Sequence, residues 1–397
     1  MMSDLPRDME EEVLSKLPMT SLRRARFTCK RWNNSLSKNL SFTKKYKNEA
    51  AKRKEEYQVV MMLEYKVYLM SVNLLNPSPS IEPIGKLFSL DDATHDGVDI
   101  GKIFHCDGLL LCVTKDRTRL VVWNPFNGQT RWIQPRDTYH SCDRYALGYE
   151  NTTKYSRRSH KVLRFVDDYD HSLKRRVCEF EIFNLNTSSW KVVDFNPGWM
   201  MIQYFYRGLS LKGNTYWFAE ENLVGKIGRV FLLCFNFTTE SFGPRLPLPF
   251  RGRYGDTLSL SSVREEQLAV LFQKSDAPAY TLKVWISSKV GPNAVSWHKV
   301  FLSVDMKPFT GFQFLNYAGS FFVDEKKKVV VVIDMTRSPP LPIRNMAYII
   351  GENGYFKTVD LGDFANRNCW PLVCSYVPSS VKINQASPLG NQRNTRS

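Results

Sequence analysis

The sequence predicts an α+β protein in which a short helical module precedes a large all-β domain. Apolar residues recur at helical spacing before residue 56 and in short, strand-like runs after it. Aromatic residues, which favour strands, make up 13% of the 397 residues. The longest purely apolar runs, such as Val59–Leu63, are far shorter than the roughly 20 residues of a membrane-spanning helix. We therefore expect a soluble globular protein with a sizeable core and no membrane contact.

The first helix is predicted from a stripe of apolar residues at every fourth position, formed by Leu5, Met9, Val13 and Leu17. Acidic residues crowd its first turns, where carboxylates offset the helix dipole. Pro18 ends this helix because proline cannot continue it.

Two further helices are predicted before the strands begin. Thr20 or Ser21 can cap the second, and the third covers Phe42–Glu56. So small a module cannot bury its apolar stripes alone, and no disulfide or metal pattern staples it. The sequence therefore indicates a helical element that another protein completes. The apolar set of the second helix is Leu22, Ala25, Cys29 and Trp32.

The all-β region is predicted from an internal repeat, in which an apolar strand is followed by a turn and a strand that opens with an aromatic residue. The anchor positions of this repeat are 73, 124, 184, 236, 286 and 351, separated by 51, 60, 52, 50 and 65 residues. Kelch-like propeller blades repeat about every 50 residues. Four strands fit each unit, so we expect a β-propeller of about six blades. The alternative is a pair of β-sandwiches with coincidental spacing.

The ends of this domain suggest how the ring closes. The apolar strand Leu372–Tyr376 has no partner in the last repeat, and the first repeat is short of strands. We predict that this strand pairs with the strands of residues 57–75, because pairing removes an exposed edge. The polar residues 384–397 are predicted to form a disordered tail.

No pattern in the sequence indicates catalysis. Metal-protease, serine-hydrolase and phosphate-loop motifs are absent, and the six histidines form no pair at helical spacing. The eight cysteines include no Cys-x-x-Cys pair, so we interpret them as free thiols. We expect a non-enzymatic protein without a metal or cofactor.

The formal net charge of +16 leaves two interpretations open. The basic residues are spread along the chain without an RNA-binding motif or zinc-finger spacing, which favours a solvated basic surface. The alternative is a basic propeller that binds nucleic acid or another scaffold. Since the N-terminus lacks an apolar leader, we expect the protein in the cytoplasm, the nucleus or both.

Four N-terminal blocks at matching spacing resemble an F-box. The downstream region is similar to the type-1, kelch-like F-box-associated domain of the large plant F-box family. Met9, where the family more often has Leu, and Phe27, often Val, keep their positions apolar. The F-box blocks are Leu5–Asp8, Glu12–Pro18, Ser21–Arg23 and Cys29–Asn33, and the downstream motifs are Val121–Gln134, Tyr145–Tyr149, Leu211–Tyr216 and Leu258–Leu271.

This resemblance implies four parts: a three-helix F-box over residues 3–43, a connector helix over 44–56, the F-box-associated domain over 57–383 and the tail over 384–397. It implies docking on a Skp-type adaptor that is bound to a cullin and a RING protein, within a ubiquitin ligase. The implied function is substrate recognition, with an unknown protein target. The residues implied to make or support the adaptor interface are Leu5, Pro6, Val13, Leu17, Pro18, Leu22, Cys29 and Trp32.

Target binding is expected on loops of one propeller face, because functional residues favour loops on a rigid scaffold. Two aromatic- and arginine-rich turns, residues 136–144 and 199–207, are the candidates, and blade packing is the alternative interpretation of both. The candidate residues are Arg136, Tyr139, Arg144, Trp199, Tyr204 and Arg207.

Overall fold

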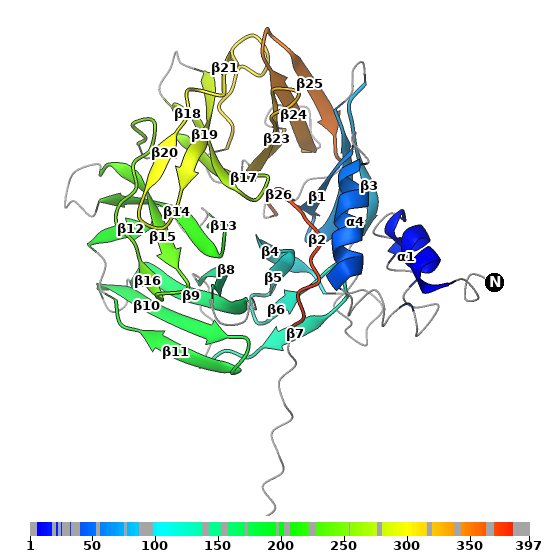
Figure 1. Cartoon of the computed structure of the whole chain (residues 1–397). Coiled ribbons are helices and arrows are strands. Elements are labelled where there is room, and N and C mark those ends of the chain that lie inside the picture. The colour runs from blue at the N-terminus through cyan, green and yellow to red at the C-terminus, as the bar shows by residue number, and fades with distance from the viewer. Residues whose placement is uncertain are drawn as a thin grey trace, which may run out of the picture.

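The computed structural model describes residues 6–17, 21–22, 25, 32, 40–52, 56–74, 78–86, 98–136, 143–151, 158–170, 174–195, 198–201, 207–221, 228–253, 255–275, 280–315, 320–336, 343–362 and 369–383. Its strands form six sheets arranged as a ring, which is a six-bladed β-propeller (Figure 1). The predicted propeller is confirmed, and the alternative of paired sandwiches is wrong. No helix in the described part of the chain is long and apolar enough to cross a membrane.

The blades follow one another in chain order. The first blade contains β1 (Glu56–Leu63), β2 (Lys66–Asn73), β3 (Ser80–Lys86) and β26 (Leu372–Ser375). The second contains β4 (Ile100–Cys106), β5 (Leu109–Thr114), β6 (Leu120–Trp123) and β7 (Thr130–Ile133). The third contains β8 (Arg144–Glu150), β9 (Ser159–Asp170), β10 (Arg175–Asn184) and β11 (Ser189–Val193). The fourth blade contains β12 (Trp199–Met201), β13 (Leu209–Leu211), β14 (Asn214–Glu221), β15 (Val230–Asn236) and β16 (Ser241–Phe242). The fifth contains β17 (Thr257–Val263), β18 (Gln267–Gln273), β19 (Thr281–Val290), β20 (Val295–Trp297) and β21 (Leu302–Asp305). The sixth contains β22 (Ser320–Asp324), β23 (Val329–Met335), β24 (Asn345–Gly351) and β25 (Phe356–Asp360).

The recurring sequence phrase marks the hairpin between the third and fourth strands of a blade. In three blades the third strand ends at or runs into an asparagine whose side-chain oxygen accepts a hydrogen bond from the backbone N–H two residues later. The donors are Phe126 for Asn124, Asn186 for Asn184 and Thr238 for Asn236, at 2.9, 2.8 and 2.9 Å. This Asx-turn satisfies backbone groups that the sheet leaves free. The repeat is therefore a turn signal.

The predicted closure of the ring is confirmed. Strand β26 pairs antiparallel with β1, with Val60 opposite Cys374 and Met61 opposite Val373. The C-terminal strand thus completes the first blade as its innermost strand, next to β1. This pairing removes two sheet edges, one at each end of the domain.

The helical part differs from the prediction in its bounds. Helix α1 spans Arg7–Ser15, and α4 spans Leu40–Lys52. The third helix was expected to run from Phe42 to Glu56, but Glu56 already pairs with Asn73 in the first blade. Strand pairing therefore takes over where local helix propensity would continue the helix. Most of the predicted second helix and residues 384–397 lie outside the described residues.

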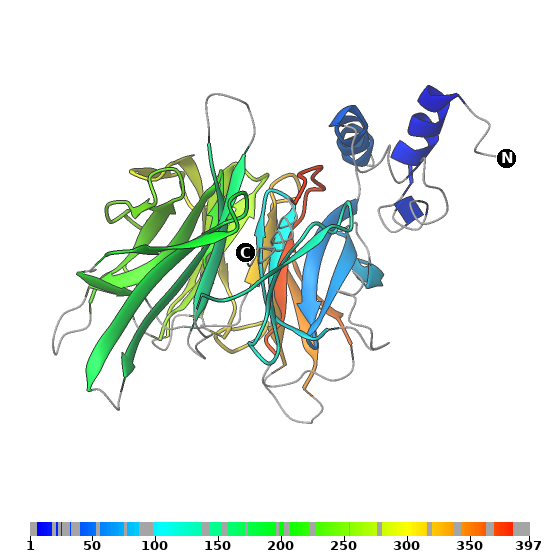
Figure 2. The same cartoon turned by 90° about the horizontal axis from the view of Figure 1, so that it is seen from below.

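Helix α4 attaches the helical part to the propeller. Phe42 and Tyr46 are fully buried, in the same core as side chains of the first two blades. The Tyr46 ring lies 5.5 Å from that of Phe126, in the turn between β6 and β7. Both helices lie beyond one end of the ring (Figure 2). We call this end the near face and the opposite end the far face.

Candidate functional site

Helix α1 has one buried side and one exposed apolar side. Glu10 and Leu14, one turn apart, are only 4% and 2% exposed. Met9 is 56% exposed and Val13, one turn further, is partly buried, while Pro6 before the helix is exposed. Because residues four apart share a helix face, Met9 and Val13 present apolar surface away from the core.

One ion pair links α1 to α4, and a second lies within the α1 segment. The Glu12 carboxylate lies 2.7 Å from Lys45 Nζ on α4 and 2.9 Å from Lys16 Nζ on its own chain segment. Hydrogen bonds to Lys45 and then Lys16 lower the pKa of Glu12 to about 2. Since these groups are exposed, the pairs orient α1 more than they stabilise it.

The predicted adaptor residues fall into three groups. Leu22 is 1% exposed and belongs to the core, and Leu17 and Trp32 pack partly buried against that same core. Pro6 and Val13 lie on or beside the exposed side of α1. Leu5, Pro18 and Cys29 lie outside the described residues.

Met9 is the exposed apolar residue that the sequence interpretation left out of the adaptor set. It is the most exposed of the large apolar side chains in the described part of the chain, ahead of Val192 at 53% and Val300 at 43%. The helical stripe through Met9 carried the signal. Met9 was left out because the family more often has Leu at this position, so Met9 was interpreted only as a departure from the family pattern.

The structure separates the predicted target-binding residues. Arg144 and Trp199 are buried, at 9% and 7% exposure. The Trp199 ring lies 5.0 Å from Phe242 and 5.8 Å from Phe195, so its side chain packs within the blades and offers little surface to a target. Blade packing is thus the interpretation that describes Trp199. Tyr139 and Tyr204 lie outside the described residues.

Arg136 is tied to a buried ion-pair network on the third blade. Its Nε lies 2.6 Å from Glu181, whose other oxygen accepts from Arg164 at 3.0 Å. Arg164 also donates to Asp143 at 2.9 Å. The ion pair therefore holds the guanidinium of Arg136 at its Nε, and the Arg136 side chain is still 46% exposed to solvent.

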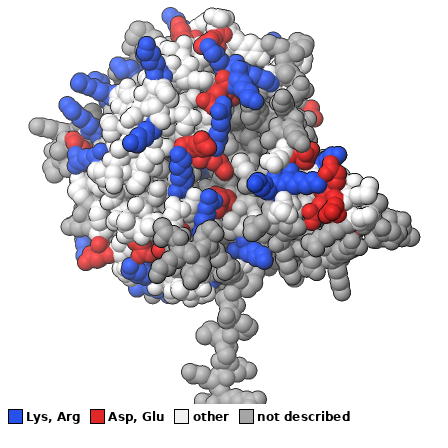
Figure 3. All heavy atoms as spheres, viewed as in Figure 1, with Lys and Arg blue, Asp and Glu red and all other residues white. Residues whose placement is uncertain are grey.

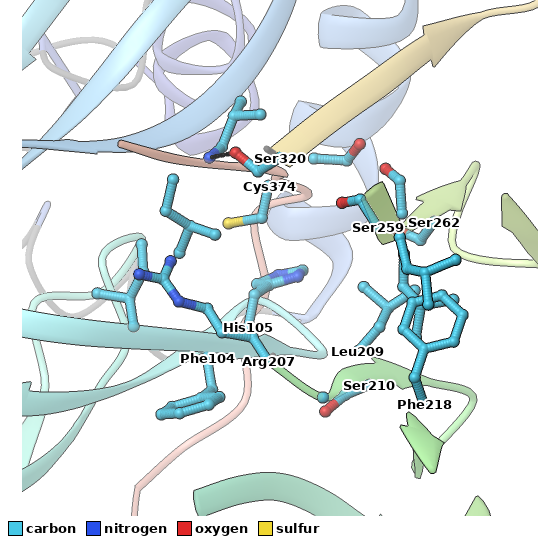
Figure 4. A pocket seen from close by; sticks show the side chains of 18 residues that line it. Phe104, His105, Arg207, Leu209, Ser210, Phe218, Ser259, Ser262, Ser320 and Cys374 are labelled. Carbon is cyan, nitrogen blue, oxygen red and sulfur yellow. Dashed lines mark hydrogen bonds between the residues drawn. The ribbon is translucent and has the colours of Figure 1, made fainter. Parts of the chain in front are cut away.

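Arg207 lines the central channel of the propeller. A cavity of about 90 Å³ lies between the inner strands β4, β13, β17, β22 and β26. Figure 4 shows Arg207 reaching into it beside His105 and Cys374, with Ser259 and Ser262 on the other side. Burial lowers the pKa of Arg207 to about 10, a value at which the guanidinium is still charged at neutral pH.

Neither a metal site nor a single basic patch is seen among the described residues in view. No group of three or more His, Cys, Asp or Glu side chains among them could hold a metal ion. On the face shown in Figure 3, Lys and Arg side chains are scattered with Asp and Glu between them. This arrangement matches a solvated basic surface better than a single nucleic-acid-binding patch.

Comparison with known proteins identifies both parts of the chain. The F-box domain model matches residues 2–44, and the F-box associated beta propeller domain model matches residues 58–383. The Arabidopsis thaliana F-box/kelch-repeat protein At3g16740 is 60% identical over 396 residues, covering 96% of this chain and 99% of its own. F-box protein At5g42460 of the same plant is 53% identical, covering 97% of this chain and 99% of its own.

Among solved structures, the similarity is remote. The Hadza microbial sialidase Hz136 aligns with a TM-score of 0.42 and 9% identity, covering 78% of this chain and 68% of its own. The two family models together span both the helical part and the ring of blades. The chain belongs to the plant F-box proteins that carry an F-box-associated β-propeller domain.

Proposed function

We propose that this chain is the substrate-recognition subunit of a cullin–RING (SCF-type) ubiquitin ligase in the cytoplasm or nucleus. Proteins that combine an F-box with this propeller generally act as non-catalytic substrate receptors. The observation that carries the proposal is the exposed apolar side of α1, where Met9 is 56% exposed. This side lies within the part of the chain that the F-box model matches, where Pro6, Met9 and Val13 together offer apolar surface to a partner.

In this proposal α1 and its neighbours dock on a Skp-type adaptor, which in turn binds the cullin and the RING protein. Burying one large apolar side chain in that interface contributes about 1.5–3 kcal/mol. Leu14 and Leu22 support the interface from the core, while Pro6, Met9 and Val13 contact the adaptor.

The propeller holds the target on its far face. Strands alternate in direction within a blade, so Arg136, which follows β7, lies toward the end of the ring opposite α4, whereas Arg207 lines the central channel. A target bound there is tethered near the charged ubiquitin carrier, which raises the effective concentration of its lysines. The chain itself then needs no catalytic residue.

Co-purification with a Skp-type adaptor tests the proposal. Wild type and Val192→Lys, which changes an exposed apolar residue of the propeller, are expected to form a stoichiometric complex. Met9→Lys is expected to weaken binding at least about tenfold, because it places a charge in an apolar interface. The Leu5→Ala, Pro6→Ala double variant is expected to lose the complex as well.

The outcome is decisive in either direction. If wild type does not bind any Skp-type adaptor, the proposed function is wrong. If Met9→Lys binds the adaptor as well as wild type and the Val192→Lys control do, the adaptor contacts another side of the F-box, and the interface assigned to α1 is wrong.

A further inference from the structure

Arg207 differs from the other partly buried arginines of the propeller. Arg164 contacts two carboxylates, Arg176 lies 2.6 Å from Asp167, and Arg131 donates to Ser188 at 2.7 Å. Arg207 has neither a hydrogen bond nor an ion pair among the residues that the structure describes. A partly buried cation is costly to maintain without a partner, so this guanidinium is suited to an anion from outside the chain.

The cavity that Arg207 enters contains no opposing charge. Its described lining includes no Asp or Glu side chain. Burial lowers the pKa of His105 to about 4 and raises that of Cys374 to about 12, so both groups are neutral at pH 7. The Glu265 carboxylate, 3.9 Å from the His105 ring, lies outside the lining. Arg207 is therefore the charged side chain among the described residues that line the cavity.

Serine hydroxyls supply further donors on the other walls. Ser259 and Ser262 on β17 have no hydrogen-bond partner in the described part of the chain. The oxygen of Ser320 on β22 accepts from the backbone N–H of Val373 at 2.8 Å, which leaves its own proton free to donate. Figure 4 shows Ser259 and Ser262 on the opposite side of the cavity from Arg207, and Ser320 beside Cys374.

The size and arrangement of the cavity select a compact anion with several oxygens. Its volume of about 90 Å³ exceeds several-fold the roughly 10–15 Å³ that one water needs. A carboxylate offers two oxygens along one edge, whereas a phosphate offers oxygens in tetrahedral directions. Donors on several walls match the phosphate, and guanidinium groups bind it with paired hydrogen bonds.

We propose that the central channel of the propeller is a phosphate-binding site, with the guanidinium of Arg207 as its charged anchor and the hydroxyls of Ser259, Ser262 and Ser320 as additional donors. Arg207 directly precedes β13 and lines the channel. A phosphate can therefore arrive either as a free small molecule or on a phosphoserine of a peptide bound at the far face. The site does not depend on adaptor binding by α1.

Calorimetry on the full-length chain tests this proposal with inorganic phosphate as the probe. Wild type and Arg251→Gln, a change at an exposed arginine, are expected to bind phosphate with equal affinity. Arg207→Gln is expected to weaken binding at least tenfold, and Ser259→Ala by a few-fold. Absence of phosphate binding by wild type, or equal affinity of wild type and Arg207→Gln, overturns the proposal.

Thermal unfolding separates a binding role of Arg207 from a structural one. Without phosphate, Arg207→Gln is expected to melt at or above the temperature of wild type, because it removes an unpaired charge. Added phosphate should raise the melting temperature of wild type and leave that of the variant unchanged. A large drop for the variant without phosphate would mean that Arg207 serves the fold, and would overturn the assignment.

A second titration identifies the source of the phosphate. A phosphoserine peptide that binds at least tenfold more tightly than inorganic phosphate, while its unphosphorylated form does not bind, indicates a modified protein target. Equal affinity for inorganic phosphate and the peptide indicates a small phosphate ester. Both results support the site, and co-purification with the adaptor tests the ligase role separately.

Discussion

At the scale of single residues, Gly148 explains one of the sequence motifs of the domain. Strand β8 approaches the turn between β13 and β14 so closely that the backbone N–H of Tyr149 donates to the Gly213 carbonyl at 3.1 Å. A Cβ on Gly148 would lie 2.6 Å from that carbonyl oxygen and 2.2 Å from the Phe237 ring. The glycine is therefore required for the contact between the third and fourth blades.

Gly148→Ala is expected to destabilise the protein by about 1–3 kcal/mol, because the added methyl group forces the two blades apart. Gly198→Ala is a matched control, since a Cβ there meets nothing within 4 Å. Urea unfolding of both variants measures the effect. Equal midpoints would show that the blades yield without cost.

His105 makes stability depend on pH. Burial lowers the pKa of His105 to about 4 in the folded chain, against the opposing effect of Asp107, whereas an unfolded histidine titrates near about 6.5. Between these values the unfolded chain binds a proton that the folded chain does not. The contribution of His105 is therefore complete above about pH 6.5 and is lost as the pH falls toward 4.

We expect His105→Gln to reduce the loss of stability between about pH 7 and about pH 5 by up to about 1.4 kcal/mol per pH unit. His298→Gln, which changes an exposed histidine, should keep the pH dependence of wild type. Urea unfolding at each pH measures both. If the pH profile of His105→Gln matches that of wild type, the ring takes up its proton without unfolding.

At the scale of elements, β26 supplies the contact that turns a row of blades into a ring. A chain that ends at residue 371 lacks this strand and leaves β1 with a free edge. Free edges of this kind pair with other chains. We expect this truncation to aggregate or melt at a much lower temperature, whereas a chain that ends at residue 383 should behave as the full length does. Light scattering and thermal unfolding compare the two, and equal behaviour would show that closure is dispensable.

Sequence alone predicted the elements that depend on local signals. The turns after Asn124, Asn184 and Asn236 need only an asparagine and the next few residues, so their spacing revealed the blades. Contacts between blades carry no such signal. The burial of Trp199 against Phe242 and the channel position of Arg207 depend on which strands the ring brings together, which periodicity cannot reveal.

At the scale of the whole molecule, α4 fixes the orientation of the F-box relative to the propeller. Tyr46 is fully buried and touches both Phe42 on its own helix and Phe126 on the second blade. The helical part and the ring thus share a core. In the proposed function, the distance between adaptor and target is then set by packing rather than by a loose linker.

Tyr46→Ala is expected to cost about 3–5 kcal/mol locally and to free the F-box to reorient, since it empties the contact with the ring. Tyr216→Ala, which empties a buried site in the fourth blade, should lower stability without loosening the F-box. Small-angle scattering of the adaptor complexes should show a broader range of dimensions for Tyr46→Ala only. An unchanged scattering curve for this variant would assign the rigidity to other contacts.

The closure of the ring also sets the order in which a newly made chain can mature. Val60 on β1 can pair with Cys374 on β26 only after the ribosome has made the 314 residues that follow Val60. At about 5–20 residues per second, translation takes about 15–60 s to cover that distance. The F-box leaves the ribosome long before the ring can close, so in the proposed function a nascent chain is able to meet an adaptor before it is able to hold a target. In the proposed function, an mRNA that lacks the codons for β26 yields a product that occupies adaptors without a closed propeller and so competes with the intact receptor.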